Sequence, residues 1–317
     1  MFLYDMPLES LAKCRYPQVK EPDFDAFWER KLEESRRQPL NAGAEAIAYP
    51  VKELRVQKVS CEAFDGGRLV GFCITPAEIR PRPALVFYHG YTGNKGTVAH
   101  YLAWALQGFT CIAFDVRGQG GESSDDARYP GGSRPGWLTK GMLDPDAYYI
   151  TRTYVDAVRI LDLAANREDV DPDRLGVTGI SQGGGLSLAA AALDPRVKLC
   201  MAEVPGFCHF ARSLEITQEP PWTELTQFIR DHPRDYEGAL RTLSYVELNN
   251  FTDRITCPTL ISVGHLDALC VPSSIFSAYN HLAADERHLE YRPYAGHEGG
   301  LMPELMVAWS RRHLLDA

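Results

Sequence analysis

The residues most able to do chemistry in this sequence form the pentapeptide Gly179-Ile180-Ser181-Gln182-Gly183. It follows the β-rich run 174–180 and precedes the alanine-rich helical pattern 185–194. A serine in G-x-S-x-G at a strand-to-helix turn presents its hydroxyl oxygen as a nucleophile. The flanking glycines are needed because a Cβ atom there would meet neighbouring backbone in so tight a turn. The pattern predicts that Ser181 is the nucleophile of an acyl-transfer reaction, and an ordinary glycine-rich turn is the alternative.

A serine hydroxyl needs a general base, which an acid orients in its turn. Where G-x-S-x-G carries the nucleophile, the chain order is serine, then Asp or Glu, then histidine. Asp267 follows the apolar run 259–264, and His297 lies in a glycine-containing loop after the run 288–294. In an open parallel sheet, functional groups gather at the carboxyl ends of the strands. We therefore predict that Asp267 is the acid and His297 the base.

Other residues fit these two roles less well. Asp253 is the alternative acid, but it precedes the run 259–264 instead of following it. His265 also follows that run, yet it is only two residues from Asp267, which makes it a poor rival base. His209 falls in an irregular segment and is expected, at most, to line a pocket.

The oxyanion that forms during acyl transfer needs hydrogen-bond donors. One is the main-chain amide after the nucleophile, here that of Gln182, and the other comes from a loop after an early strand. The run 84–90 ends in His89-Gly90, and Tyr91 follows at once, so we predict the Tyr91 amide as the second donor. The alternative for His89-Gly90 is simple turn chemistry.

Short β-rich runs alternate with helical patterns through most of the chain. The runs are 84–90, 110–115, 174–180, 197–204, 259–264 and 288–294, and the helical patterns include 98–107, 151–166 and 185–194. This alternation predicts an α/β fold with a mostly parallel central sheet and helices on both faces.

Further elements precede and interrupt this alternation. Residues 23–37 are typical of an amphipathic helix, with Asp23 as its N-cap, and residues 51–76 of a hairpin that turns at Asp65-Gly66-Gly67. Residues 118–146 are predicted to form a long loop, and residues 205–256 a cap inserted between strands. Nothing else marks a second domain, so we expect one domain over residues 1–317.

Composition excludes several classes of protein. The 317 residues include 33 Lys and Arg against 42 Asp and Glu, a formal charge of −9 that argues against nucleic acid as a partner. No apolar stretch approaches the roughly 18 residues of a membrane span, and the start does not resemble a signal peptide. The eight cysteines are scattered without a C-x-x-C pair, which favours a reducing cytoplasm and no disulfides. No metal or nucleotide motif is present, so we expect neither a cofactor nor a metal.

The chain resembles the acetyl xylan esterase and cephalosporin C deacetylase family, carbohydrate esterase family seven. The likeness extends from Asp23-Phe24-Asp25-Ala26-Phe27-Trp28 to His297-Glu298, and its most specific part is Arg117-Gly118-Gln119 together with the Ser181 pentapeptide. Further matches are Gly141-Met142-Leu143-Asp144, Tyr148-Tyr149 and Glu203-Val204-Pro205. Two departures are His265, where the family leads us to expect an apolar residue, and Gly206, where we expect a bulkier one.

The resemblance implies an α/β-hydrolase fold in which Ser181, Asp267 and His297 form the triad and the Tyr91 and Gln182 amides hold the oxyanion. It also implies that Arg117 and Gln119 organise the surrounding loops. Members of the family are cytoplasmic, metal-independent homohexamers, built as a dimer of trimers, that remove acetyl groups from small substrates. A broader carboxylesterase or a peptidase on the same fold is the alternative, and a non-catalytic scaffold is disfavoured because all three triad residues are present in order.

Overall fold

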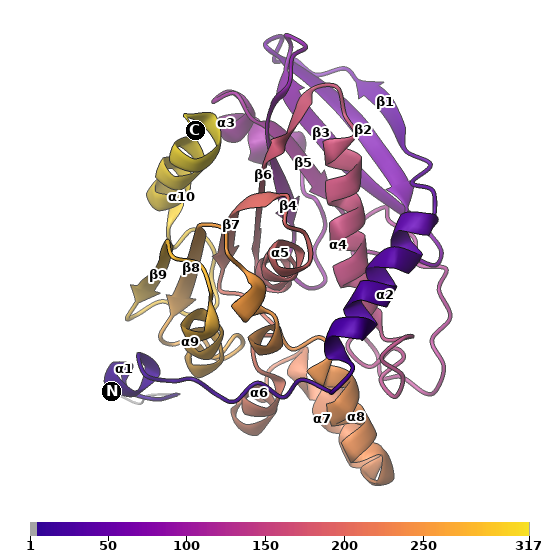
Figure 1. Cartoon of the computed structure of the whole chain (residues 1–317), viewed down its shortest axis with the longest axis vertical. Helices are drawn as coiled ribbons and strands as arrows, with labels where there is room; N and C mark the ends of the chain where they lie inside the picture. The colour runs from indigo at the N-terminus through magenta and orange to yellow at the C-terminus, as the bar shows by residue number, and fades with distance from the viewer. Residues whose placement is uncertain (1–4, 317) are drawn as a thin grey trace.

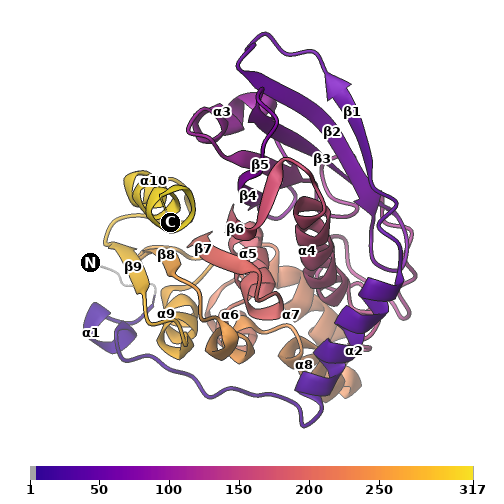
Figure 2. The ribbon, with the colours of Figure 1, turned by 45° about the horizontal axis from the view of Figure 1, so that its top comes forward.

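The computed structural model describes residues 5–316 of the chain, seen from two directions in Figures 1 and 2. In this part, nine strands form one sheet in the order β1-β2-β3-β5-β4-β6-β7-β8-β9. The strands are β1 (Gly43–Ile47), β2 (Leu54–Glu62), β3 (Arg68–Pro76), β4 (Arg82–Tyr88), β5 (Thr110–Phe114), β6 (Val170–Ile180), β7 (Val197–Glu203), β8 (Thr259–Gly264) and β9 (Arg287–Arg292). Neighbours from β1 through β3 to β5 are antiparallel, and all neighbours from β5 to β9 are parallel. The predicted mostly parallel sheet is confirmed.

Helices cover both faces of this sheet. They are α1 (Leu8–Leu11), α2 (Phe24–Arg37), α3 (Leu102–Ala105), α4 (Tyr149–Ala165), α5 (Gln182–Leu193), α6 (Phe210–Ile216), α7 (Trp222–Asp231), α8 (Tyr236–Ser244), α9 (Pro272–His281) and α10 (Pro303–Ser310). Buried side chains of α2, α4, α5 and α9 belong to one apolar core. Those of α3 and α10 belong to a second core, which includes the opposite side chains of the strands. Two cores of this kind are what strands buried on both faces require.

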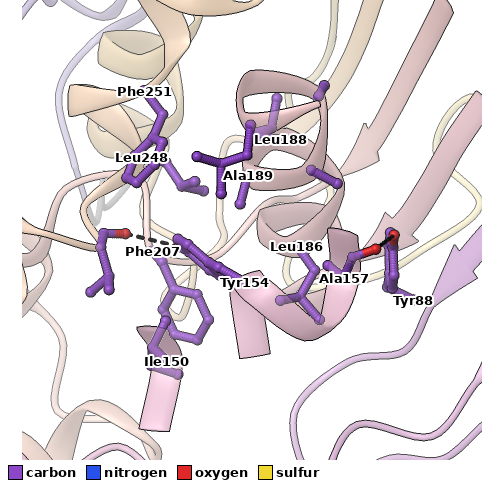
Figure 3. Packing of buried hydrophobic residues seen from close by; sticks show 14 of the residues in the cluster. Tyr88, Ile150, Tyr154, Ala157, Leu186, Leu188, Ala189, Phe207, Leu248 and Phe251 are labelled. Atoms are coloured by element: carbon purple, nitrogen blue, oxygen red, sulfur yellow. Dashed lines mark hydrogen bonds between the residues drawn. The ribbon is translucent and has the colours of Figure 1, made fainter. Parts of the chain in front are cut away.

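The α4 and α5 helices pack tightly beside the central strands (Figure 3). Two buried phenols fix α4 in place: Tyr154 donates to the Val246 carbonyl at 2.8 Å, and Tyr88 of β4 donates to the Ala157 carbonyl at 3.0 Å. Both hydroxyls thus find acceptors, so their burial leaves no polar group unsatisfied. The bond from Tyr88 ties the end of β4 to α4, beside the turn at which β6 ends.

Two local expectations need correction. Asp23 does not cap α2 with its side chain, because its carboxylate accepts a hydrogen bond from the Tyr245 hydroxyl instead. The helix expected over 98–107 is mostly 3₁₀ at its start, over Val98–Tyr101, and α-helical only in α3. The reason is a capping box between Thr97 and His100 that closes a tighter first turn.

The segment predicted as a cap contains α6, α7 and α8 and connects β7 to β8. In Figure 1, α7 and α8 extend at the bottom of the view, beyond the strands. No helix among residues 5–316 has the length and apolar character that crossing a bilayer demands. All eight cysteines are free thiols, and all of them except the half-buried Cys257 are buried.

Candidate active site

The serine of the pentapeptide sits in a strained turn between β6 and α5. Ser181 has φ 57° and ψ −120°, a conformation that residues other than glycine rarely adopt. Both flanking glycines are required by space. A Cβ atom on Gly179 would lie 2.4 Å from the Tyr88 carbonyl oxygen, and one on Gly183 would lie 2.0 Å from the same atom. The turn therefore presents the Ser181 side chain at the carboxyl end of β6.

The structure brings the predicted acid and base to this serine. Asp267 follows β8 and His297 follows β9, with His297 Nδ1 2.8 Å from Asp267 Oδ2 and His297 Nε2 3.0 Å from Ser181 Oγ. The other oxygen of Asp267, Oδ1, accepts hydrogen bonds from the Leu269 and Cys270 amides, both at 2.8 Å. Asp267 is fully buried, whereas a quarter of the His297 side chain is exposed. The three side chains thus form one continuous hydrogen-bonded relay.

The alternatives considered from the sequence lie elsewhere. Asp253 forms a surface ion pair with Lys20, with 2.6 Å between Asp253 Oδ2 and Lys20 Nζ. His265 bonds to the Tyr291 hydroxyl through Nδ1. His209 accepts a hydrogen bond from the Arg212 amide and so caps α6, and burial lowers its pKa to about 4. His209 is therefore neutral near pH 7.

The two residues predicted to hold the oxyanion line one small cavity with Ser181. The cavity is about 30 Å³ and is lined by Tyr91, Ser181, Gln182, Gly206, Phe207, Pro221, Trp222, Leu269 and Cys270. Gln182 begins α5, so its amide is among those with no acceptor inside the helix. The Gln119 side chain connects the two predicted donor segments: its Oε1 accepts from the Thr92 amide at 3.1 Å, and its Nε2 donates to Gln182 Oε1 at 2.9 Å.

The Tyr91 side chain is anchored by the cap. Its hydroxyl donates to the Glu224 carboxylate of α7, at 2.8 Å from Oε1, and accepts from the Trp137 amide at 2.7 Å. Glu224 Oε2 also accepts from the Leu138 amide at 3.0 Å. Burial raises the pKa of Tyr91 and that of the Glu224 carboxyl. This contact joins the loop after β4, the long loop 118–146 and the cap.

Arg117 is fully buried and makes its contacts away from the serine. Its Nε and Nη2 lie 2.6 and 2.8 Å from the two oxygens of Asp156 on α4, and Nη2 also donates to the Phe64 carbonyl at 2.6 Å. These contacts hold the segment after β5 against α4 and against the β2–β3 hairpin.

Glu203, at the end of β7, contacts both the serine turn and the histidine loop. Its main-chain oxygen accepts from the Ser181 amide at 2.9 Å. Its carboxylate Oε2 accepts from the amides of Gly300 at 2.6 Å and Leu301 at 3.3 Å, just beyond His297. Burial raises the pKa of the Glu203 carboxyl. No pattern of residue types or spacing predicts these contacts, and Glu203 stood out only as part of the family likeness.

The arrangement can carry out nucleophilic acyl transfer. It places a serine hydroxyl against an imidazole that a buried carboxylate holds, and a cavity beside the first amides of a helix whose dipole favours negative charge. Within the described residues, side chains with metal-ligand chemistry also gather here, namely those of Asp267, Cys270 and His297. The sheet order, the turn at Ser181 and the placement of Asp267 and His297 after successive strands define the class of the protein as an α/β-hydrolase.

Comparison with known proteins identifies the family. The family model described as acetyl xylan esterase (AXE1) matches residues 1–313. An acetyl xylan esterase from Paenibacillus sp. R4 has 41% sequence identity and a TM-score of 0.95, covering 98% of this chain and 100% of that one. Acetyl xylan esterase 1 from Thermoanaerobacterium sp. JW/SL YS485 has 31% identity and a TM-score of 0.92, with 97% and 99% covered. The chain belongs to the acetyl xylan esterase family.

A curated relative is longer than this chain. The acetyl esterase Axe7A of Xylanibacter ruminicola is 29% identical over 293 residues, which are 86% of this chain. The chain spans 63% of the length of that relative.

Proposed function

We propose that the chain is a serine carboxylesterase that removes acetyl groups from small acetylated substrates, such as xylo-oligosaccharides and cephalosporin C. The observation that carries the proposal is the unbroken relay from Asp267 through His297 to Ser181, in a member of the acetyl xylan esterase family. Ser181 would act as nucleophile, His297 as general base and acid, and Asp267 as the group that holds the imidazole.

The reaction would proceed in two halves. In the first, His297 Nε2 takes the Ser181 proton while Oγ attacks the acetyl carbonyl carbon, and the amides of Tyr91 and Gln182 stabilise the oxyanion. The bond to the leaving alcohol then breaks, and His297 protonates the alcohol oxygen. In the second half, water takes the place of the alcohol: it loses a proton to His297 and attacks the acetyl-serine. Acetate then leaves as His297 returns that proton to Ser181 Oγ.

The size of the cavity supports a short acyl group. Its small volume of about 30 Å³, walled by Phe207, Trp222 and Leu269, favours a short acyl chain over a longer one. Forcing extra methylenes into a packed site costs about 1–3 kcal/mol. We expect kcat/KM for p-nitrophenyl butyrate to fall about 10- to 100-fold below that for the acetate ester, measured by release of p-nitrophenol.

Two comparisons sharpen this test. Leu269→Ala enlarges the cavity and should reduce the preference for acetate over butyrate, whereas an equal rate on both esters with the unaltered enzyme would contradict the cavity argument. Acetylated xylo-oligosaccharides, cephalosporin C and aminoacyl p-nitroanilides extend the panel. Hydrolysis of the anilides in preference to the acetyl esters would favour the peptidase alternative.

Glu203 should act as a positioning residue for this reaction. Glu203→Ala removes the acceptor that holds the His297 loop, so we expect kcat to fall about 10- to 100-fold, because small displacements of a reacting group cost that much, with little change in KM. Glu203→Gln keeps one carbonyl oxygen as acceptor and should recover part of the loss. Glu45→Ala, an exposed position on β1 at the sheet edge opposite β9, is the control and should retain full activity. Equal losses in the alanine and glutamine variants would count against positioning through the acceptor oxygen.

The homohexameric assembly and the cytoplasmic location are further proposals. The assembly rests on the family likeness, and the location rests on that likeness and on the eight free cysteines. Several large apolar side chains are exposed, among them Ile79 and Leu106, and an assembly could cover them.

A further inference from the structure

One buried thiol lies within the site without a part in the proposed reaction. Cys270 Sγ is 4.0 Å from Ser181 Oγ, and the thiol lines the same cavity as the serine. Cys270 is 5% exposed, and burial raises its pKa well above the usual value. The thiol is therefore protonated at neutral pH and does not compete with Ser181 as a nucleophile.

The thiol belongs to a group of side chains with complementary metal-ligand chemistry. Asp267, Cys270 and His297 each offer one ligand atom, and these atoms lie within 4.8 Å of one another. Ser181 Oγ adds an oxygen 3.0 Å from His297 Nε2. Sulfur, imidazole nitrogen and oxygen are the ligands of zinc-class cations, at bond lengths of about 2.0–2.3 Å. An ion between these groups would require them to close together by up to about 1 Å.

The relay also orients the imidazole as a metal ligand. Histidines that bind metals usually donate the other ring N–H to a carboxylate, which fixes the free nitrogen toward the ion. His297 Nδ1 faces Asp267 Oδ2 at 2.8 Å, which leaves Nε2 directed toward Ser181 Oγ, and that oxygen lies 4.0 Å from Cys270 Sγ. The contact that would make His297 a good base therefore also makes it a good ligand.

We propose that Cys270 Sγ and His297 Nε2 form a binding site for one zinc-class divalent cation, with Asp267 behind the imidazole and Ser181 Oγ as a further oxygen ligand. On binding, the Cys270 thiol releases one proton to solvent and forms a sulfur–metal bond, the imidazole donates its lone pair, and nothing is oxidised or reduced. The ion is an inhibitor and not a cofactor, because it occupies the lone pair that would accept the Ser181 proton. Hard cations such as Mg²⁺, which prefer oxygen ligands, should not be bound.

Cadmium provides a readout that does not depend on activity. Titration of the full chain with Cd²⁺ should produce the ultraviolet charge-transfer absorption of a cadmium thiolate, saturating at one ion per chain. Ser181→Ala should still show this absorption, whereas Cys270→Ala should lose it. In esterase assays, Zn²⁺ should inhibit reversibly on addition of a chelator, and Cys270→Ala should raise the half-inhibitory concentration at least about 10-fold relative to its own metal-free rate.

Cys257 gives the matched control, because it is the more accessible thiol and lies near the amino end of β8. Cys257→Ala should leave both cadmium absorption and zinc inhibition unchanged.

The proposal is overturned if Cys270→Ala is inhibited at the wild-type concentration, if Mg²⁺ inhibits as well as Zn²⁺, or if the absorption persists without Cys270. The expected inhibition rests on the proposed function, but the absorption titration does not. A chain without esterase activity would contradict the proposed function, and the cadmium titration would still test the metal site. Cys270→Ser, which keeps the size of the side chain, serves if the alanine variant does not fold.

Discussion

Replacing Ser181 with alanine should lower kcat for p-nitrophenyl acetate by about 10⁵- to 10⁶-fold, as expected when the nucleophile of a serine–histidine pair is removed. The substitution deletes only Oγ, the atom 3.0 Å from His297 Nε2. Alanine keeps the Cβ atom that the turn already accommodates at φ 57°, so the fold should be retained. Stopped-flow or steady-state release of p-nitrophenol measures the loss, and a serine-directed fluorophosphonate should label the wild-type chain once and the variant not at all.

A second serine in the same region controls for nonspecific effects. Ser187 lies on α5 and donates to the Gly183 carbonyl at 2.9 Å, without contact to His297. Ser187→Ala should keep both activity and labelling. Wild-type turnover by the Ser181→Ala protein, with an unchanged unfolding temperature, would refute the proposed mechanism.

Asp267→Asn should lower kcat by about 10⁴-fold while leaving the fold intact. The expected cause is a fixed amide orientation. Because Oδ1 of Asp267 accepts two main-chain hydrogen bonds, the asparagine oxygen should stay on that side and turn its NH₂ group toward His297 Nδ1. The imidazole would then carry its proton on Nε2, the atom that has to accept the proton of Ser181. Steady-state kinetics give kcat, and the NMR signals of the histidine ring report the tautomer.

Asp253→Asn is the matched control, because Asp253 was the alternative acid and lies at the surface beside Lys20. It should leave kcat unchanged. Asp267→Asn with kcat within about tenfold of wild type, or an equal loss in Asp253→Asn, would reassign the acid.

Much of the fold was predictable because its signals are local. Parallel strands buried on both faces appear as short apolar runs, and the glycines around Ser181 mark a turn in which backbone atoms leave no space for a Cβ atom. Strand β1 escaped prediction, since Gly43–Ile47 is short, lies at the sheet edge and lacks an apolar run. The N-cap role of Asp23 was wrong for a different reason: its side chain is used by Tyr245, which is distant in the sequence.

The sequence was enough to predict which side chains meet at the candidate site, but not which contacts hold them there. The order of Ser181, Asp267 and His297 follows from where strands end, so residue type and position were enough to select them. By contrast, Glu203 and Glu224 act through carboxylates that meet main-chain amides about 97 and 86 residues away. Such contacts depend on the conformation that the loops adopt on the folded sheet, and no spacing along the chain predicts that conformation.

The buried carboxylate of Glu224 has a consequence for anyone who wishes to redesign this protein. Pro221 and Trp222 wall the cavity, and Glu224, two residues beyond Trp222, holds the hydroxyl of Tyr91. The α7 helix and the proline before it therefore help to shape the cavity that the substrate enters. The same helix also holds Tyr91, whose amide would stabilise the oxyanion. Mutational libraries that randomise α7 to widen the range of ester substrates should lower kcat as well, unless Glu224 is kept constant.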